Sequence, residues 1–215
     1  MRPLFEDNHL LVLCKTAGLL TQPSGTDQDS LETQAKTWLK AKYAKPGNVF
    51  LEAVHRLDKP ASGVVVFAKT SKALSRLNQS IRDKNAKKDY YALVEGTPKE
   101  LEGTLEHYLI HDDFKASVVA KSHPNAKASR LHYRVVEKKK EGTLLAIDLE
   151  TGRYHQIRAQ LSAIGCPIVG DRKYGSEKVL VQKEAIALHH IRLTIAHPVT
   201  KEPVTFEAPL PGYFD

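Results

Sequence analysis

The stretch HRLDKPASG at residues 55–63 lies between two apolar segments and decides how this part of the chain folds. Residues 49–54 (VFLEAV) precede it, and residues 64–68 (VVVFA) follow it. The pattern predicts a strand, a polar loop punctuated by proline and glycine, and a second strand. A carboxylate held on such a loop, here Asp58, is well placed for nucleophilic or acid–base chemistry. The alternative is an ion pair between Arg56 and Asp58 that braces the turn.

The composition favours a polyanionic partner. The chain has 215 residues, with 32 Lys and Arg against 25 Asp and Glu and a formal net charge of +7. A positive balance promotes binding to nucleic acid through phosphate neutralisation, although an ordinary basic protein has the same composition. The length suffices for one large domain or two small lobes with a substantial core.

Cysteine use and hydropathy indicate a cellular compartment. Cys14 and Cys166 stand beside apolar residues, far apart in the sequence, and neither belongs to a Cys-x-x-Cys pair. We therefore expect reduced, buried thiols in a cytoplasmic protein. No apolar signal segment opens the chain, and no stretch approaches membrane-spanning length. The prediction is a monomer without membrane attachment.

Apolar periodicity predicts a mixture of α and β elements. Helices are expected after a cap at Asp29 or Ser30 (with Leu31, Ala35, Trp38 and Leu39 on one face), after a cap at Ser71, and over residues 154–164 with Gly165 as the C-terminal stop. Strands are expected over residues 10–15, 90–94, 191–196 and 203–206, and repeatedly within 104–149, where residues 131–136 alternate with period two. Strands outnumber helices, and many have the pattern of antiparallel neighbours. The predicted fold is α+β, with a mixed, largely antiparallel central sheet flanked by helices.

A second polar motif is TGRYHQIR at residues 151–158. A glycine turn that opens a helix presents free backbone N–H groups and the positive end of the helix dipole to an anion. Arg153 lies at the turn, and Gln156 and Arg158 fall within the first turns of the helix. An ordinary basic helix start is the alternative.

A third motif, KDYYALVEG at residues 88–96, carries two adjacent tyrosines. On a strand, Tyr90 and Tyr91 should point to opposite faces. A phenol can stack on a base and exchange a proton, whereas a tyrosine pair without a function places one ring in the core and one on the surface.

The ten histidines raise the question of a metal site. His107 and His111 are four residues apart, and His189 and His190 adjoin, so that on a strand they would face apart. No third ligand accompanies either pair. We expect ordinary buried or exposed histidines and no metal.

Together these motifs resemble those of the RluA-type pseudouridine synthases. Residues 55–63 are similar to the family string HRLD-x-x-[TS]-SG, residues 151–158 to TG-R-x-H-Q-[IL]-R, and residues 88–96 to K-x-Y-x-A-x-V-x-G. Weaker similarities follow in family order at residues 165–175, 188–190, 197–200 and 206–211. Three positions depart from the family pattern: Ala61 replaces threonine, Cys166 replaces histidine and His190 replaces alanine.

The resemblance spans nearly the whole chain. It implies a pseudouridine synthase-like fold and a single catalytic domain over residues 1–215, without the small S4-type RNA-binding domain that many relatives carry. Recognition of RNA would then fall to loops of the catalytic domain, such as residues 111–127, and to the helix after Ser71.

The resemblance also implies a reaction, the isomerisation of uridine to pseudouridine in ribosomal or transfer RNA without cofactor or metal. Asp58 is the implied nucleophile, attacking the nucleoside at the ribose. Tyr90 would stack on the base and assist proton removal, and Arg158 would pair with the catalytic aspartate. The base must leave its stack, and Arg56 would fill the vacated position. Further substrate contacts are expected from His55, Arg153 and Gln156.

Two other functions remain open at this level. A catalytically silent RNA-binding relative would share the basic charge, although it would not need the three implied catalytic residues. A carboxylate-dependent hydrolase would need a second positioned carboxylate, for which Asp171 is the candidate. The flanking Arg172 and Lys173 indicate instead that Asp171 belongs to a structural pair.

Overall fold

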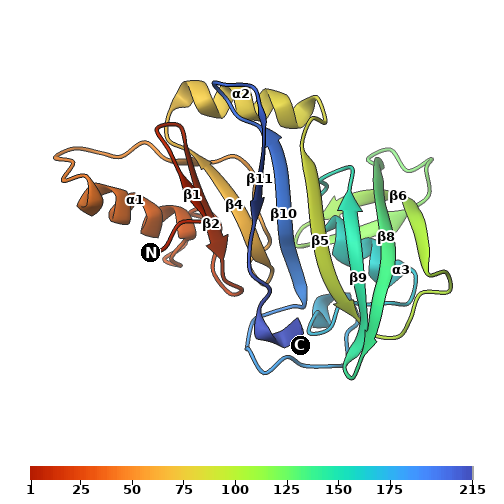
Figure 1. Ribbon diagram of the computed structural model, residues 1–215. Helices are drawn as coiled ribbons and strands as arrows, with labels where there is room; N and C mark the ends of the chain where they lie inside the picture. The colour runs from red at the N-terminus through yellow and green to blue at the C-terminus, as the bar shows by residue number, and fades with distance from the viewer. Residues whose placement is uncertain (215) are drawn as a thin grey trace. The chain divides into compact units, whose positions relative to one another are not determined.

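The computed structural model describes residues 1–214, which divide into two compact units (Figure 1). Unit 1 consists of Met1–Lys87 and His190–Leu210, and unit 2 begins at Lys88, continues to His189 and includes the residues from Pro211 onward. The described secondary structure is α+β and largely antiparallel, as predicted. A single domain over the whole chain stays a prediction.

Unit 1 contains the strands β1, β2, β4 and β10 in that order, with β3 paired to β4 and β11 paired to β10. Their bounds are Phe5–Glu6 (β1), Leu10–Lys15 (β2), Glu52–Ala53 (β3), Ser62–Ala68 (β4), Leu188–Ala196 (β10, unit 1 from His190) and Pro203–Glu207 (β11). The β1–β2, β2–β4, β3–β4 and β10–β11 pairs are antiparallel. Every residue of β4 is buried, as expected for a central strand of continuous apolar sequence.

The strand predicted over residues 49–54 is wrong except at its end. Only Glu52–Ala53 pairs, with the last two residues of β4. One edge of β4 is taken by β2 along residues 63–68, so β3 and β10 share the other edge. Little of β4 is therefore left for β3, and residues 49–51 lie outside the sheet.

Helix α1 (Leu31–Lys42) begins where the sequence indicates. Ser30 is the N-cap, and its side chain accepts the backbone N–H of Thr33. Leu31, Ala35 and Leu39 are buried, whereas Trp38, predicted on the same face, is only partly covered.

Helix α2 (Ser71–Arg82) corrects the predicted cap by one residue. Thr70, with φ −144°, is the N-cap that accepts the N–H of Ala73, and Ser71 is already helical. Ala73 and Leu77 join the core of unit 1 with side chains from β2, β4, β10 and β11. Figure 1 shows α2 lying across the ends of β4 and β10.

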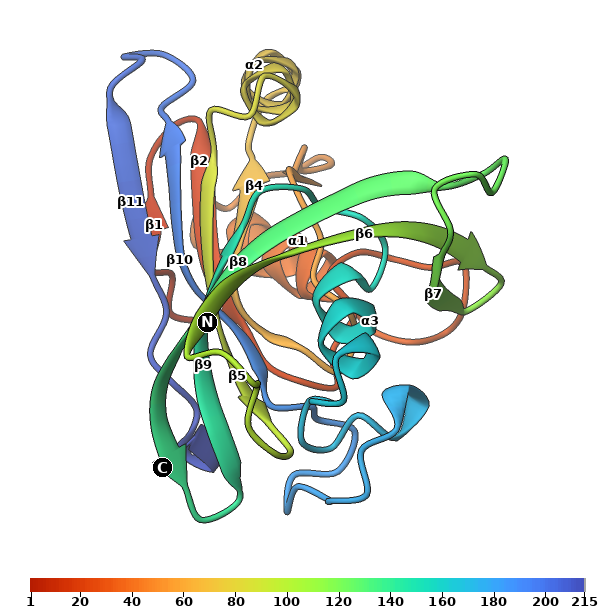
Figure 2. The same ribbon diagram turned by 90° about the vertical axis from the view of Figure 1, so that its right-hand side faces the viewer.

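Unit 2 contains antiparallel strands in the order β5-β9-β8-β6-β7. The bounds are Lys87–Val94 (β5, unit 2 from Lys88), Glu102–Asp112 (β6), Lys115–Val119 (β7), Lys127–Lys139 (β8) and Gly142–Leu149 (β9). The long strands β6 and β8 curve together in Figure 2. Leu131 and Tyr133 are buried between exposed His132 and Arg134, which confirms the predicted alternation on β8.

Helix α3 (Gln156–Ala163) starts two residues later than predicted. His155 has a left-handed backbone with φ +49°, so the helix cannot include it. Gly165, with φ +76°, follows the end of α3 as expected for a C-terminal stop. Ala159 of α3 packs with side chains of β6, β7 and the short 3₁₀ helix η1 (Arg172–Tyr174). A second 3₁₀ turn, η2, spans Gly212–Phe214.

The helices and the cysteines bear on the expected surroundings of the chain. Within residues 1–214, no helix has the length and apolar character needed to cross a bilayer. Cys166 is buried, whereas Cys14 is only partly covered, and both thiols are free.

Candidate active site

The loop at residues 55–63, hereafter the signature loop, alternates in exposure. Arg56 is exposed, Leu57 is buried and Asp58 is partly exposed. A turn follows, because the carbonyl of Asp58 accepts the N–H of Ala61 at 3.0 Å. Ala61, which replaces the threonine of the family pattern, is buried and contributes a methyl group to the interior.

Hydrogen bonds hold the signature loop on both sides of Asp58. The buried hydroxyl of Thr21 accepts the N–H of Leu57 at 3.1 Å and donates to its carbonyl at 3.0 Å. The carbonyl of Lys59 accepts the N–H of Gly18 at 2.9 Å. Both chain neighbours of Asp58 are thus fixed by the segment that follows β2, which orients the backbone carrying the carboxylate.

Lys15, the last residue of β2, adds a charged contact to this arrangement. Its side chain is fully buried, and its Nζ donates to the carbonyls of Thr16 (3.0 Å), Leu19 (2.7 Å) and Lys59 (3.0 Å). Burial lowers the pKa of the Lys15 ammonium from 10.5 to about 7, against the opposing attraction of Asp58. Lys15 therefore joins the signature loop to the end of β2 and lies in the electrostatic field of Asp58.

The end of the signature loop requires glycine. Gly63 has φ +125°, and a Cβ there would come within 2.3 Å of the carbonyl oxygen of His190 on β10. The backbones of β4 and β10 can approach only without a side chain at this position. His190 Nδ1 lies 2.8 Å from the carbonyl of Val64, and its ring meets that of His55 edge-on. His55 Nε2 in turn accepts the N–H of Val66 at 3.3 Å.

In unit 2, Gln156 binds the turn at residues 151–153 of the motif TGRYHQIR, hereafter the TGR turn of the TGR motif. Its Oε1 accepts the N–H of Arg153 at 3.0 Å and the hydroxyl of Thr151 at 2.8 Å, while its Nε2 donates to the carbonyl of Arg130 at 3.1 Å. Gln156 is buried, and its amide is engaged with the protein on both sides. Arg153 is exposed, with its Nε bonded to the carbonyl of Ala128.

Arg158 is held rigidly on α3. Its guanidinium makes a two-bond ion pair with Asp171, with Nε to Oδ2 at 2.6 Å and Nη2 to Oδ1 at 2.9 Å, and both side chains are buried. The ring of Tyr174 lies 4.9 Å from the guanidinium carbon. The hydroxyl of Tyr174 accepts the N–H of Ala116, which leaves its own proton for Nδ1 of His155.

This ion pair confirms that Asp171 belongs to a structural pair and corrects the identity of its partner. The residues flanking Asp171 were expected to pair with it, but Arg172 and Lys173 are exposed and the partner comes from α3. A buried carboxylate occupied by a guanidinium is not available as a general acid or base, which removes the second carboxylate that a hydrolase would need. Asp58 and Arg158 belong to different units, and the pairing that the resemblance implies between them stays a prediction.

The two tyrosines of β5 have the expected alternation. Tyr90 is buried and Tyr91 is partly exposed, on opposite faces of the strand. Lys88 precedes Tyr90 by two residues and shares its face. A Cβ added to Gly152 would lie 3.6 Å from Lys88 Nζ, so this ammonium adjoins the turn of the TGR motif.

The structure therefore distributes the predicted site residues between the units. His55, Arg56 and Asp58 lie on the signature loop of unit 1, whereas Tyr90, Arg153, Gln156 and Arg158 belong to β5 and the TGR region of unit 2. Sequence reasoning missed the contributions of Lys15 and Thr21. A lysine ending an otherwise apolar strand was the available signal for Lys15.

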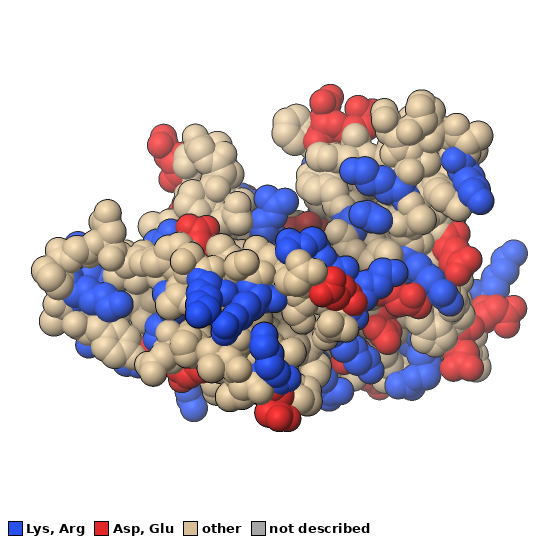
Figure 3. Space-filling model, turned by 90° about the horizontal axis from the view of Figure 1, so that it is seen from above, with Lys and Arg blue, Asp and Glu red and all other residues tan. Residues whose placement is uncertain are grey.

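The exposed basic side chains of α2 and the arrangement of potential metal ligands also bear on function. Lys72, Arg82 and Lys84, on α2 and directly after it, are exposed, and Figure 3 looks onto the side of the molecule on which α2 lies, with Lys and Arg side chains spread across it. No group of three or more potential metal ligands occurs within residues 1–214.

Comparisons with known proteins identify the family. A sequence profile of the RNA pseudouridylate synthase family matches residues 9–163. The chain belongs to this family. It is 34% identical over 212 residues to the RNA pseudouridine synthase YhcT of Bacillus subtilis (strain 168), covering 97% of this chain and 68% of that protein. It is also 34% identical over 209 residues to the dual-specificity RNA pseudouridine synthase RluA of Escherichia coli (strain K12), covering 96% and 91%. These relatives place it with the RluA-type pseudouridine synthases, which are isomerases.

Relatives differ in how much of their length this pseudouridine synthase spans. It matches 62% of the ribosomal large subunit pseudouridine synthase D of Nitrosomonas europaea, at 35% identity. Among solved structures, human RNA pseudouridylate synthase domain containing 4 has a TM-score of 0.81 at 23% identity, covering 99% of this chain and 89% of that one. At this identity the likeness concerns the fold, and it confirms the predicted pseudouridine synthase-like architecture.

Proposed function

We propose that this chain isomerises uridine to pseudouridine in ribosomal or transfer RNA, with Asp58 as the nucleophile and without a cofactor. The observation that carries the proposal is the hydrogen-bonded support on both sides of Asp58. Leu57 and Lys59 are each bound to the segment after β2, so a partly exposed carboxylate stands on a loop that is fixed immediately before and after it. Such support keeps a nucleophile in a reactive geometry.

In the proposed reaction, a carboxylate oxygen of Asp58 bonds to the ribose as the bond from the ribose to N1 of uracil breaks. The freed base turns and forms a bond to the ribose through C5, and the carboxylate leaves. The proton on C5 is then removed with the help of Tyr90, while N1 ends protonated. Substrate and product have the same atoms, so the scheme needs neither a redox cofactor nor phosphoryl transfer.

The remaining residues are proposed to act around this chemistry. Arg158, whose orientation is supported by Asp171 and Tyr174, is proposed to pair with the nucleophilic carboxylate and orient it. Exposed Arg56 is proposed to occupy the position that the base leaves, and His55 and Arg153 to contact the substrate. Because the amide of Gln156 is bonded to the TGR turn, we propose that it contributes by shaping that turn.

The proposed substrate follows from charge and from relatives. The names of the relatives refer to RNA and, for synthase D, to the large ribosomal subunit. The net charge of +7 and the exposed lysines and arginines of α2 are suited to a phosphate backbone. We infer a cytoplasmic location, where ribosomal and transfer RNA are found, and the monomeric state stays a prediction.

The test is Asp58→Asn, which keeps the shape of the side chain and removes its nucleophilic carboxylate. We expect loss of all measurable pseudouridine formation on ribosomal and transfer RNA extracted from cells, with folding and RNA affinity retained. Asp27→Asn, at an exposed loop position, is the matched control and should keep full activity. Measurable turnover by Asp58→Asn would refute the nucleophile. A wild-type protein that binds RNA without forming pseudouridine would favour the silent relative.

A further inference from the structure

Lys88 carries a positive charge for which the fold provides no partner. Its side chain is only partly exposed, and burial lowers the pKa of its ammonium. Within residues 1–214, the side chain of Lys88 forms no hydrogen bond or ion pair, and no carboxylate offsets the effect of burial on its pKa. Desolvating a cation without a compensating anion disfavours the folded state. Stability of the fold therefore does not account for a lysine in this environment, whereas a bound anion would.

The position of Lys88 indicates what could compensate it. Lys88 and Tyr90 are two residues apart on β5 and therefore share one face of the strand. Lys88 Nζ lies against Gly152, where a Cβ would be 3.6 Å away, and Arg153 follows as an exposed cation. The ammonium thus adjoins the TGR turn and lies on the same strand face as the proposed base-stacking tyrosine.

The nearest acidic residue in sequence does not neutralise Lys88. Asp89 adjoins it on β5 but points to the opposite face, where its register partner on β9 is Asp148. The face shared by Lys88 and Tyr90 therefore combines an ammonium, a phenol and a glycine turn. A face that carries an ammonium and a ring able to stack is suited to bind a phosphodiester next to a nucleobase.

We propose that Lys88 binds a backbone phosphate of the substrate RNA close to the target nucleotide. This inference rests on the proposed function, because it assigns a substrate group to the same site. The negative charge of an RNA phosphate would compensate the Lys88 ammonium. Lys88 therefore destabilises the free protein and becomes favourable only in the complex with RNA.

The test compares Lys88→Met with Lys99→Met in the full chain. Lys99 is exposed on a loop of unit 2, so both variants lose one positive charge. The probe is fluorescently labelled bulk transfer RNA, with the dissociation constant measured over a series of salt concentrations. Each lysine–phosphate contact contributes about 0.7 to the slope of log K against log salt for single strands. We expect the slope for Lys88→Met to fall by about this amount, with roughly tenfold weaker binding at low salt. Lys99→Met should match the wild type.

A second measurement distinguishes a substrate contact from a structural role. Removing an uncompensated, partly buried charge should raise the midpoint of urea unfolding of free Lys88→Met, and Lys88→Arg should retain the wild-type salt slope. A lower midpoint for Lys88→Met would show that the ammonium stabilises the fold and would overturn the proposal. Equal salt slopes for Lys88→Met and Lys99→Met would overturn it as well.

The proposed function can fail independently of this site. If wild-type protein forms no pseudouridine in any RNA but Lys88→Met still reduces the salt slope, the phosphate contact stands and the isomerase proposal falls. If the wild type is active and the slopes are equal, the isomerase proposal stands and the phosphate contact falls.

Discussion

Adjacent tyrosines on β5 illustrate how much depends on a single residue. Tyr90 and Tyr91 have the same chemistry, yet the strand directs them to opposite faces, and only one can serve a given site. Tyr90 is buried and lies on the same face as Lys88, whose ammonium adjoins the TGR turn. A buried and a partly exposed ring are expected of a tyrosine pair with or without a function, so the catalytic role of Tyr90 stays a prediction from the family motif.

The tyrosine assignment predicts different effects for two conservative variants. Tyr90→Phe retains the stacking ring and loses the hydroxyl, so it should bind RNA almost normally and slow pseudouridine formation by about a hundredfold if it transfers a proton. Tyr91→Phe should leave the rate almost unchanged. Single-turnover rates on one RNA substrate provide the comparison. A slower reaction for Tyr91→Phe than for Tyr90→Phe would move the catalytic assignment to the other face of the strand.

Among the elements, the segment after β2 has the clearest functional consequence. It carries Gly18 and Thr21, which bind the backbone of the signature loop next to Asp58, as does Lys15 at the end of β2. The internal bond from Ala61 to the carbonyl of Asp58 closes the turn of the loop, and these three residues attach the loop to β2 and the segment that follows it. The geometry of the loop therefore depends on a segment distant in the sequence.

This arrangement predicts that Thr21 is a positioning residue. Thr21→Val keeps the volume of the side chain but leaves the N–H and the carbonyl of Leu57 without their buried partner. We expect a loss of about 1–3 kcal/mol in the free energy of unfolding. We also expect a fall in kcat of roughly tenfold or more with KM nearly unchanged, because displacement of the nucleophile affects the chemical step more than RNA binding. Thr21→Ser keeps the hydroxyl and should restore kcat. If Thr21→Val and Thr21→Ser have equal kcat, the hydroxyl does not position the loop.

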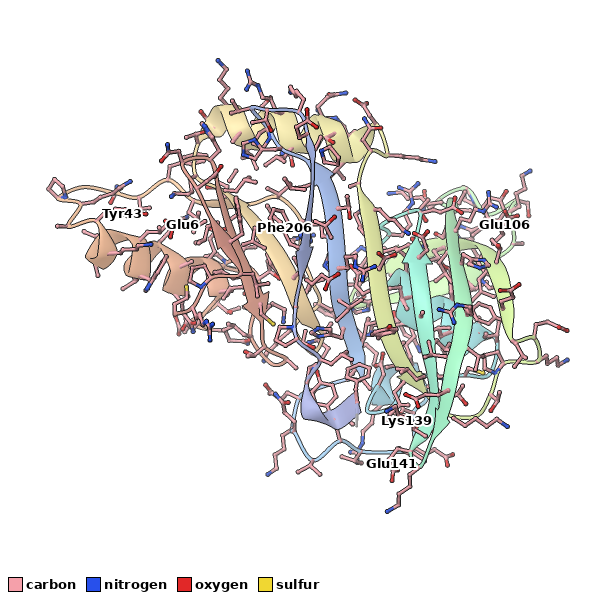
Figure 4. All side chains as sticks on the ribbon, viewed as in Figure 1. Glu6, Tyr43, Glu106, Lys139, Glu141 and Phe206 are labelled. Atoms are coloured by element: carbon pink, nitrogen blue, oxygen red, sulfur yellow. The ribbon has the colours of Figure 1, made fainter. Side chains whose placement is uncertain are left out.

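At the scale of the whole molecule, the proposed catalytic groups come from two compact units, Asp58 from unit 1 and Tyr90 and Arg158 from unit 2. Stability of each unit therefore affects activity. In unit 1, Glu6 of β1 joins three separate parts of the chain. It accepts hydrogen bonds from Lys42 at 2.6 Å, from the hydroxyl of Tyr43 at 2.7 Å and from Lys69 at 3.0 Å. Glu6 and Tyr43 are labelled in Figure 4.

This cluster predicts how stability depends on pH. Burial acts to raise the pKa of Glu6, but the hydrogen bonds from Lys42, Tyr43 and Lys69 outweigh it and lower the pKa from 4.5 to about 2. The folded state therefore favours the ionised form, and this stabilisation is present above pH 4.5 and lost as the pH falls toward 2. Glu6→Gln should lower the free energy of unfolding by about 1–3 kcal/mol near pH 6, with the difference from wild type vanishing near pH 2.

Urea unfolding at a series of pH values measures this difference. Glu52→Gln, at an exposed position of β3, is the control and should follow the wild type throughout. A difference between Glu6→Gln and the wild type that stayed constant from pH 6 to pH 2 would contradict the assigned pKa.

The sequence by itself determined the family, the α+β class and most element positions. Alternation on β8, the cap at Ser30 and the stop at Gly165 are local properties, because each depends on residues within a few positions of one another. The three motifs were recognisable for the same reason. Two of the errors were also local in kind. A one-residue shift of the α2 cap and the left-handed backbone of His155 both concern which residue first adopts helical angles.

Only the tertiary structure decided what each polar side chain touches. Thr21 binds a residue 36 positions away, and Lys15 one 44 positions away, so no local spacing encodes either contact. Asp171 pairs with Arg158 of α3, whereas its charged neighbours in the sequence face solvent. The side-chain amide of Gln156, predicted from the motif to contact substrate, accepts the backbone N–H of Arg153 in the TGR turn and donates to the carbonyl of Arg130 on β8. Hydrogen bonds select partners by distance and direction in space, and those are fixed only when strands far apart in the sequence pair.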